Sequence, residues 1–197
     1  MAVHKLILYP AQVDSPVLST AALVAALHSI GLIAAPLHHD EASGYRAGER
    51  FLQLITFLGC SPAIELEPPA DPAERERVCA SGSLCHVRLA PAENRLRFRA
   101  EAGLPAPRCP RCRKAEPRWQ ELIEQWRNDA RESHWICREC GYCGRLFDLN
   151  FRKRGAFGHT FIEIWGIHAA EAVPGETLLT ALGELSGCDW NYLYLRE

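Results

Sequence analysis

Two cysteine pairs constrain this chain more than any other feature of its sequence. Cys109 and Cys112 form one C-x2-C pair, and Cys137 and Cys140 form a second pair after 24 intervening residues. Each pair places two thiolates on one tight turn, and two such turns that face each other complete a tetrahedral shell of four sulfur ligands. This shell suits Zn2+, so the spacing predicts one structural zinc ion. Four thiolates leave no open position for water, which argues against a catalytic zinc.

The four cysteines resemble those of a zinc ribbon, in which two knuckles at β-turns bind one metal ion. The resemblance covers residues 104–150 and implies a small module held together by zinc. Gly141 directly follows the second pair and can adopt the left-handed conformation that a knuckle requires. Arg113 stands at the equivalent position of the first pair, which leaves open whether the two knuckles share one conformation. Cys143 is an alternative ligand to Cys140, although a free thiol is the simpler interpretation.

The composition is that of a folded globule, with 48% apolar and 23% charged residues in a chain of 197. This length allows one hydrophobic core plus a small accessory module. No stretch approaches the roughly 20 apolar residues that span a bilayer, and the N-terminal residues lack the features of a signal peptide. We therefore expect a cytoplasmic protein. In a reducing compartment the nine cysteines are expected to be metal ligands and buried thiols, not disulfides.

Apolar periodicity predicts an α+β body around the cysteine segment. The expected strands are 4–9, 63–67, 84–90, 95–99, 159–167 and 190–196, and the expected helices are 17–30, 48–58 and 174–185. Residues 68–82 are predicted to be a surface loop, and a short helix is expected within 116–132. The order of elements resembles a ferredoxin-like or related α/β sandwich with strands of mixed direction. The predicted domains are a body of 1–103 and 155–197 and a zinc-ribbon insertion of 104–154.

Charge is distributed unevenly along the chain and indicates a binding surface. Residues 86–154 hold 16 Lys and Arg against 9 Asp and Glu, a charge of +7, whereas the remainder carries −9. We expect a non-enzymatic adaptor or regulatory protein whose basic ribbon engages an acidic protein partner, with nucleic acid as the alternative and a homodimer as a further option. The candidate partner-binding residues are Arg111, Arg113, Trp126, Trp135, Arg152, Lys153 and Arg154. The aromatic residues could instead pack on the knuckles and the body.

Weaker patterns suggest a second metal site or an enzyme. Cys60, Cys79, Cys85 and His86, with His38, His39 and Asp40, match no recognised ligand spacing. A Cys–His nucleophile pair would combine Cys60 or Cys85 with His159 or His168, and Glu163 is expected to be the outward residue of its strand. The GAFGH segment after Arg154 is expected to be a glycine-rich turn. No pattern assigns a role to Cys188. An enzyme of unknown class with a site on the body is therefore the third interpretation.

Overall fold

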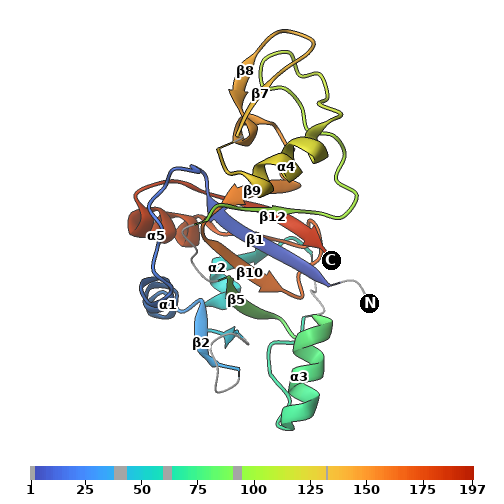
Figure 1. Cartoon of the computed structure of the whole chain (residues 1–197). Helices are drawn as coiled ribbons and strands as arrows, with labels where there is room; N and C mark the ends of the chain where they lie inside the picture. Colours follow the sequence, from blue (N-terminus) through green and yellow to red (C-terminus); the bar gives the residue numbers. More distant parts are fainter. Residues whose placement is uncertain (1–2, 38–43, 60–63, 91–94, 132) are drawn as a thin grey trace. The chain divides into compact units, whose positions relative to one another are not determined.

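The computed structural model describes residues 3–37, 44–59, 64–90, 95–131 and 133–197. The chain is a mixed α/β protein with antiparallel sheets, and it divides into two compact units (Figure 1). Unit 1 comprises Met1–Arg97 and Gly158–Glu197, and unit 2 comprises Phe98–Phe157. Within the described residues, no helix has the length and apolar character needed to cross a membrane.

Unit 1 is built on a six-stranded sheet in the order β12-β1-β10-β5-β3-β2. Every strand pair in this sheet is antiparallel, which corrects the expectation of mixed directions for neighbouring strands. Four of these strands, β12, β1, β10 and β5, are neighbours in the sheet. Along the chain they occur in the order β1, β5, β10, β12, so their order in the sheet is 4-1-3-2. The strands are β1 (His4–Pro10), β2 (Ile33–Pro36), β3 (Tyr45–Ala47), β5 (His86–Ala90), β10 (Phe161–Trp165) and β12 (Trp190–Arg196).

Two helices cover one face of this sheet with apolar side chains. α1 (Thr20–Ser29) contributes Leu23 and Leu27 to the core, and α5 (Glu176–Ser186) contributes Leu178 and Leu182. From the sheet, alternate residues of β1 and β10 face this core, because successive side chains of a strand point to opposite faces. α1 begins three residues later than expected, since the Ser19 hydroxyl accepts a hydrogen bond from the Ala22 N–H and caps the helix there.

Two further expectations for unit 1, one for a helix and one for a loop, were wrong. The helix expected over 48–58 ends after one turn: α2 spans Phe51–Leu54, and β4 (Ile55–Phe57) then pairs with β11 (Ala172–Pro174). The loop expected over 68–82 contains the ten-residue helix α3 (Pro72–Ser81). Asp71 caps α3 by accepting a hydrogen bond from the Glu74 N–H, and Gly82 ends the helix with φ of +70°.

Unit 2 contains short β pairs, one helix and an aromatic core. β7 (His134–Ile136) pairs with β8 (Cys143–Arg145), and β9 (Gly155–Gly158) pairs with β6 (Arg97–Ala100). β9 replaces the expected glycine-rich turn, and β6 places residues 98–103 in this unit. α4 (Trp119–Asn128) and the 3-10 turn Leu146–Asp148 complete it. Aromatic rings meet edge to face or tilted at centroid distances of 4.7–6.3 Å; they belong to Phe98, Trp119, Trp126, Phe147, Phe151 and Phe157.

Candidate metal centre

The two cysteine pairs of unit 2 form knuckles with the same backbone hydrogen bonds. In the first, the Arg113 N–H donates to the Cys109 carbonyl at 3.0 Å and the Cys109 N–H donates to the Lys114 carbonyl at 2.9 Å. In the second, the Gly141 N–H donates to the Cys137 carbonyl at 2.9 Å and the Cys137 N–H donates to the Tyr142 carbonyl at 2.8 Å. The spacing from donor to acceptor is identical in the two knuckles.

A left-handed residue completes each knuckle. Gly141 has φ of +68°, as the sequence indicates, and Arg113 has φ of +61° at the equivalent position. The two knuckles therefore share one conformation, although a side chain in this region carries a conformational cost of about 1–2 kcal/mol. A sheet-like bridge supports each turn: Arg108 pairs with Ala115 and Asn150 beside the first knuckle, and β7 pairs with β8 beside the second.

The knuckles bring the four sulfur atoms together. The Sγ atoms of Cys109, Cys112, Cys137 and Cys140 all lie within 4.8 Å of one another. Two of the six separations are 3.9 Å, between Cys109 and Cys140, and 3.7 Å, between Cys112 and Cys137. Four sulfurs at 2.3 Å from a tetrahedral zinc ion lie about 3.8 Å apart. The four cysteines can therefore hold a metal ion. Cys143 is exposed on β8 and does not belong to this group.

The protonation of the thiols fits a cation at the centre of this cluster. Burial raises the pKa of Cys109, but backbone N–H groups of Cys112 and Arg111 and neighbouring thiols outweigh it and lower that pKa to about 7. For Cys112, the Lys114 N–H lowers the pKa, while burial and the three other thiols raise it to about 12. The Cys109 thiolate thus forms readily, whereas the Cys112 thiol resists ionisation. A divalent cation would remove this repulsion and allow all four to be thiolates.

The two tryptophans predicted to touch a partner lie in the interior of unit 2. Trp126 is 4% exposed and packs edge to face against Phe157 at 5.1 Å, and Trp135 is 3% exposed beside the second knuckle. The Trp135 indole N–H donates to the Arg145 carbonyl at 3.0 Å, so its polar atom is satisfied within the unit. Neither ring presents a face on which a base could stack. Their burial favours the packing interpretation of these aromatic residues.

The predicted basic residues differ in what they contact. Arg154 forms an ion pair with Glu101 at 2.6 Å and is committed within unit 2. Arg152 and Lys153 are exposed at the centre of a turn in which both have positive φ, 53° and 59°, and the Arg152 guanidinium donates to the Ala106 carbonyl. Arg111 and Arg113 are exposed on the first knuckle and form no ion pair with any described residue.

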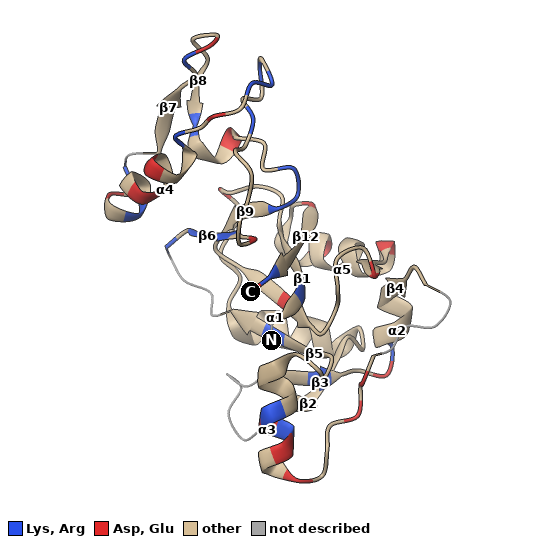
Figure 2. Cartoon of the chain, turned by 90° about the vertical axis from the view of Figure 1, so that its right-hand side faces the viewer, with Lys and Arg blue, Asp and Glu red and all other residues tan. Residues whose placement is uncertain are grey.

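The knuckles carry two further exposed cations that the sequence analysis did not select. Lys114 lies on the first knuckle and Arg138 on the second, and neither forms an ion pair among the described residues. We call Arg111, Arg113, Lys114 and Arg138 the knuckle cations. Figure 2 shows Lys and Arg along the loops of unit 2. The unit as a whole holds 13 Lys and Arg against 8 Asp and Glu, a charge of +5, whereas unit 1 carries −7.

The structure does not assemble the other predicted sites from the residues it describes. Apart from the four knuckle cysteines, no cluster of three or more metal-ligating residues occurs in the described chain. Cys85 is buried, and burial followed by the charge of Glu171 raises its pKa to about 12, which makes it a poor nucleophile. His168 stacks on His4 at 4.0 Å. His38, His39, Asp40 and Cys60 lie outside the described residues.

Unit 1 contains a polar row that the sequence analysis missed, on the sheet face opposite the α1–α5 core. Glu163 faces away from that core as predicted, yet it is only 6% exposed and lies 3.4 Å from the Lys5 amine. The row continues through Trp165 and Arg88 to His86, which is fully buried. Each residue alone fits an ordinary alternating strand, so only the register between β1, β10 and β5 identifies the row.

Comparison with known proteins leaves these sites to be interpreted on their own geometry. No family model, curated protein or solved structure matches the chain.

Proposed function

We propose that this protein is a non-enzymatic binding protein in which one zinc ion orders a basic module for contact with an acidic protein surface. Zinc is the metal best suited to four thiolates in a near-tetrahedral arrangement, and the fully thiolate site leaves no position for a reacting water. The role of the metal is therefore structural. The matching hydrogen bonds of the two knuckles and their flanking β bridges support a zinc ribbon as the architecture of this module.

The strand order of unit 1 supports a ferredoxin-like body. β12, β1, β10 and β5 lie side by side in that order, with α1 between β1 and β5 and α5 between β10 and β12 along the chain. In such a chain, β5 and β10 are separated by the whole of unit 2, so the ribbon is an insertion between two central strands.

The observation that carries the binding role is the placement of the knuckle cations. Each is one or two residues from a cysteine of the cluster, so its Cα lies within about 4–8 Å of a ligand Cα. Because metal binding would fix the turns, it would also fix where these charges stand, which lowers the ordering cost of a contact. Four thiolates around zinc carry a formal charge of −2, and the cations offset this charge and leave the surface attractive to carboxylates.

The burial of Trp126 and Trp135 favours a protein partner over single-stranded nucleic acid, which needs exposed rings for stacking. Duplex DNA or RNA requires only phosphate contacts, and the same basic surface could supply them. Nucleic acid is therefore the alternative that the experiment must separate. A cytoplasmic location agrees with a module built on reduced cysteines.

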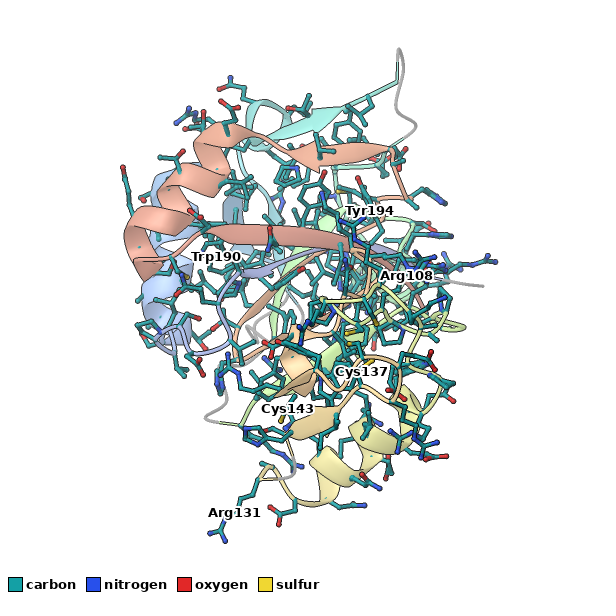
Figure 3. All side chains as sticks on the ribbon, turned by 90° about the horizontal axis from the view of Figure 1, so that it is seen from above. Arg108, Arg131, Cys137, Cys143, Trp190 and Tyr194 are labelled. Carbon is teal, nitrogen blue, oxygen red and sulfur yellow. The ribbon has the colours of Figure 1, made fainter. Side chains whose placement is uncertain are left out.

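The test combines metal analysis with a binding titration on the full chain. We expect one zinc ion per chain, and we expect a fluorescent Asp/Glu-rich peptide to bind in low salt. Arg111→Glu, Arg113→Glu and Arg138→Glu together should weaken binding about 10- to 100-fold, as expected when several exposed charge contacts are reversed. Arg131→Glu is the matched control, because Arg131 is exposed and points away from the unit beyond α4 (Figure 3).

Two results would count against the proposal. If duplex DNA or single-stranded RNA of comparable charge binds much more tightly than the peptide, and loses affinity in the triple variant, the partner is a nucleic acid. If the triple variant and Arg131→Glu behave alike for every probe, the knuckle cations are only solvated charges.

A further inference from the structure

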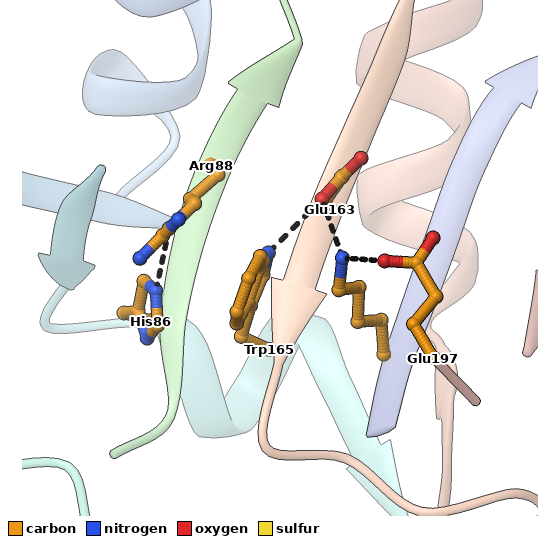
Figure 4. Close-up of polar contacts among 6 residues, drawn as sticks. His86, Arg88, Glu163, Trp165 and Glu197 are labelled. Atoms are coloured by element: carbon orange, nitrogen blue, oxygen red, sulfur yellow. Dashed lines mark hydrogen bonds and ion pairs between the residues drawn. The ribbon is translucent and has the colours of Figure 1, made fainter. Parts of the chain in front are cut away.

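Arg88 of unit 1 is held in a fixed orientation by two uncharged groups. Its Nε–H donates to the His86 Nε2 atom at 2.9 Å, and its guanidinium carbon lies 3.9 Å from the centroid of the Trp165 ring (Figure 4). The His86 Nδ1 atom lies 2.8 Å from the Leu84 carbonyl, so Nδ1 carries the proton and Nε2 accepts from Arg88. Burial, as the largest influence, lowers the pKa of His86 to about 4 and keeps the imidazole in this neutral state.

The nearby carboxylates are committed to other partners. Arg88 and Glu163 are directly opposite each other in the β5–β10 register, the position at which a cross-strand ion pair normally forms. However, the Glu163 carboxylate accepts from the Trp165 indole N–H at 3.0 Å and lies 3.4 Å from Lys5. Lys5 also pairs with Glu197 at 2.6 Å, so both carboxylates gather on the Lys5 side of the indole.

Glu163 acts on the Arg88 charge through space, but among the described residues none forms an ion pair with Arg88. A lysine or histidine can respond to partial burial by losing its proton. The arginine guanidinium stays protonated at any ordinary pH, so Arg88 keeps its positive charge. Among the described residues, only Nε donates to another protein atom, and the two terminal nitrogens keep the fork that binds two oxygens of one carboxylate or phosphate. Gly44 packs against the stem of this side chain, where a Cβ would lie 2.9 Å from the Arg88 Cγ.

We infer that Arg88 is an anion-binding residue, which takes a small carboxylate or phosphate through its two terminal nitrogens. His86 and Trp165 are positioning residues: the imidazole fixes the rotation of the guanidinium, and the indole fixes its plane. His86, Arg88 and Trp165 all belong to unit 1. The ligand is oriented by the same features that make arginine a common receptor for carboxylates and phosphates.

The test uses the full zinc-loaded chain titrated with inorganic phosphate and, separately, with succinate at constant ionic strength. Trp165 contacts Arg88, so binding is followed by tryptophan fluorescence, with Trp165→Phe identifying the responding ring. We expect saturable binding of one of the two anions. Arg88→Met should weaken it about 10- to 100-fold, the loss expected for two charge-assisted hydrogen bonds.

Two further variants make the result decisive. Arg88→Lys keeps the charge and the fold but loses the fork, so it should bind more weakly than wild type. Arg46→Met is the control, because Arg46 already pairs with Glu67 at 3.0 Å. Linear, non-saturating responses to both anions, or equal affinities for wild type, Arg88→Met and Arg88→Lys, would overturn the assignment. The preferred anion separates a carboxylate ligand from a phosphate ligand.

Discussion

The matching of the two knuckles predicts the effect of exchanging their left-handed residues. Arg113 and Gly141 have φ of +61° and +68° and make equivalent hydrogen bonds to the first cysteine of their pairs. A residue with a side chain pays about 1–2 kcal/mol to adopt this left-handed conformation, and replacing it by glycine removes that cost. Glycine also raises the conformational entropy of the unfolded chain, which destabilises the folded state by about 0.4–1 kcal/mol. Arg113→Gly should therefore tighten metal binding by about 0.5–1 kcal/mol, roughly two- to fivefold.

The reverse substitution should have the opposite effect. An added Cβ at Gly141 meets no atom within 4 Å, so Gly141→Arg has only the conformational cost and should weaken zinc binding by a similar factor. The double exchange should return the affinity close to that of wild type, because the cost moves from one knuckle to the other. The measurement is competition for zinc with a chromophoric chelator at fixed pH, since folding of such modules is coupled to metal binding.

One control separates backbone from side chain. Arg113→Ala removes the guanidinium but keeps a Cβ in the left-handed region, so its zinc affinity should stay close to that of wild type. The reasoning is refuted if Arg113→Ala tightens binding as much as Arg113→Gly, because charge and not backbone would then set the affinity. It is also refuted if the double exchange is as weak as Gly141→Arg alone.

Three further predictions follow from unit 2 and from the buried histidine. Chelation of zinc should remove amide protection across residues 98–157 while the strands of unit 1 stay protected in hydrogen exchange; uniform loss would contradict two separable units. Trp126→Ala should destabilise unit 2 by about 3–5 kcal/mol in chemical denaturation, with Trp126→Phe less harmful, because the ring fills an aromatic core. The pKa of His86 is lowered to about 4 in the folded protein, so folding favours the neutral imidazole. The stability of unit 1 should therefore be highest above about pH 6.5 and should fall by about 3 kcal/mol towards pH 4, as the imidazole of the unfolded chain becomes protonated. His86→Gln should flatten this pH dependence in urea titrations.

Local patterns were sufficient to predict the elements whose apolar residues face one way. β1, β12 and α5 are found close to the ranges predicted from their periodicity. The cysteine cluster was also accessible from sequence, because C-x2-C spacing fixes two ligands within one turn and only two turns must meet. In each case, the information lies within about a dozen neighbouring residues.

The missed elements depend on information that periodicity does not carry. α3 has a complete set of end signals in Asp71, Pro72 and Gly82, but its middle is charged and only Cys79 is buried, so no apolar stripe marks it. The segment after Phe51 has helical spacing at Leu54 and at the next apolar positions, yet the chain extends from residue 55 because β4 pairs with β11 more than a hundred residues away. Tertiary pairing overrides the local preference there.

The candidate sites show the same division between local and nonlocal information. Aromatic residues interleaved with arginine are compatible with base stacking and with a packed core, and only the contacts of Trp126 and Trp135 distinguish the two. The polar row of unit 1 is still less visible, because β1, β5 and β10 lie far apart in sequence. It becomes apparent only when their register sets His86 opposite Trp165 and Trp165 opposite Lys5.

The presence of arginine in the first knuckle has a thermodynamic explanation that also bears on function. A strained residue persists where the surrounding structure determines its conformation more strongly than the strain opposes it. A structural zinc ion supplies on the order of 10–16 kcal/mol of apparent binding free energy, which exceeds the cost of one left-handed side chain about tenfold. The metal would thus allow Arg113 at a position where glycine is easier to accommodate. Arg113 is exposed and forms no ion pair with any described residue, so its side chain is available for the contact with an acidic partner that we propose.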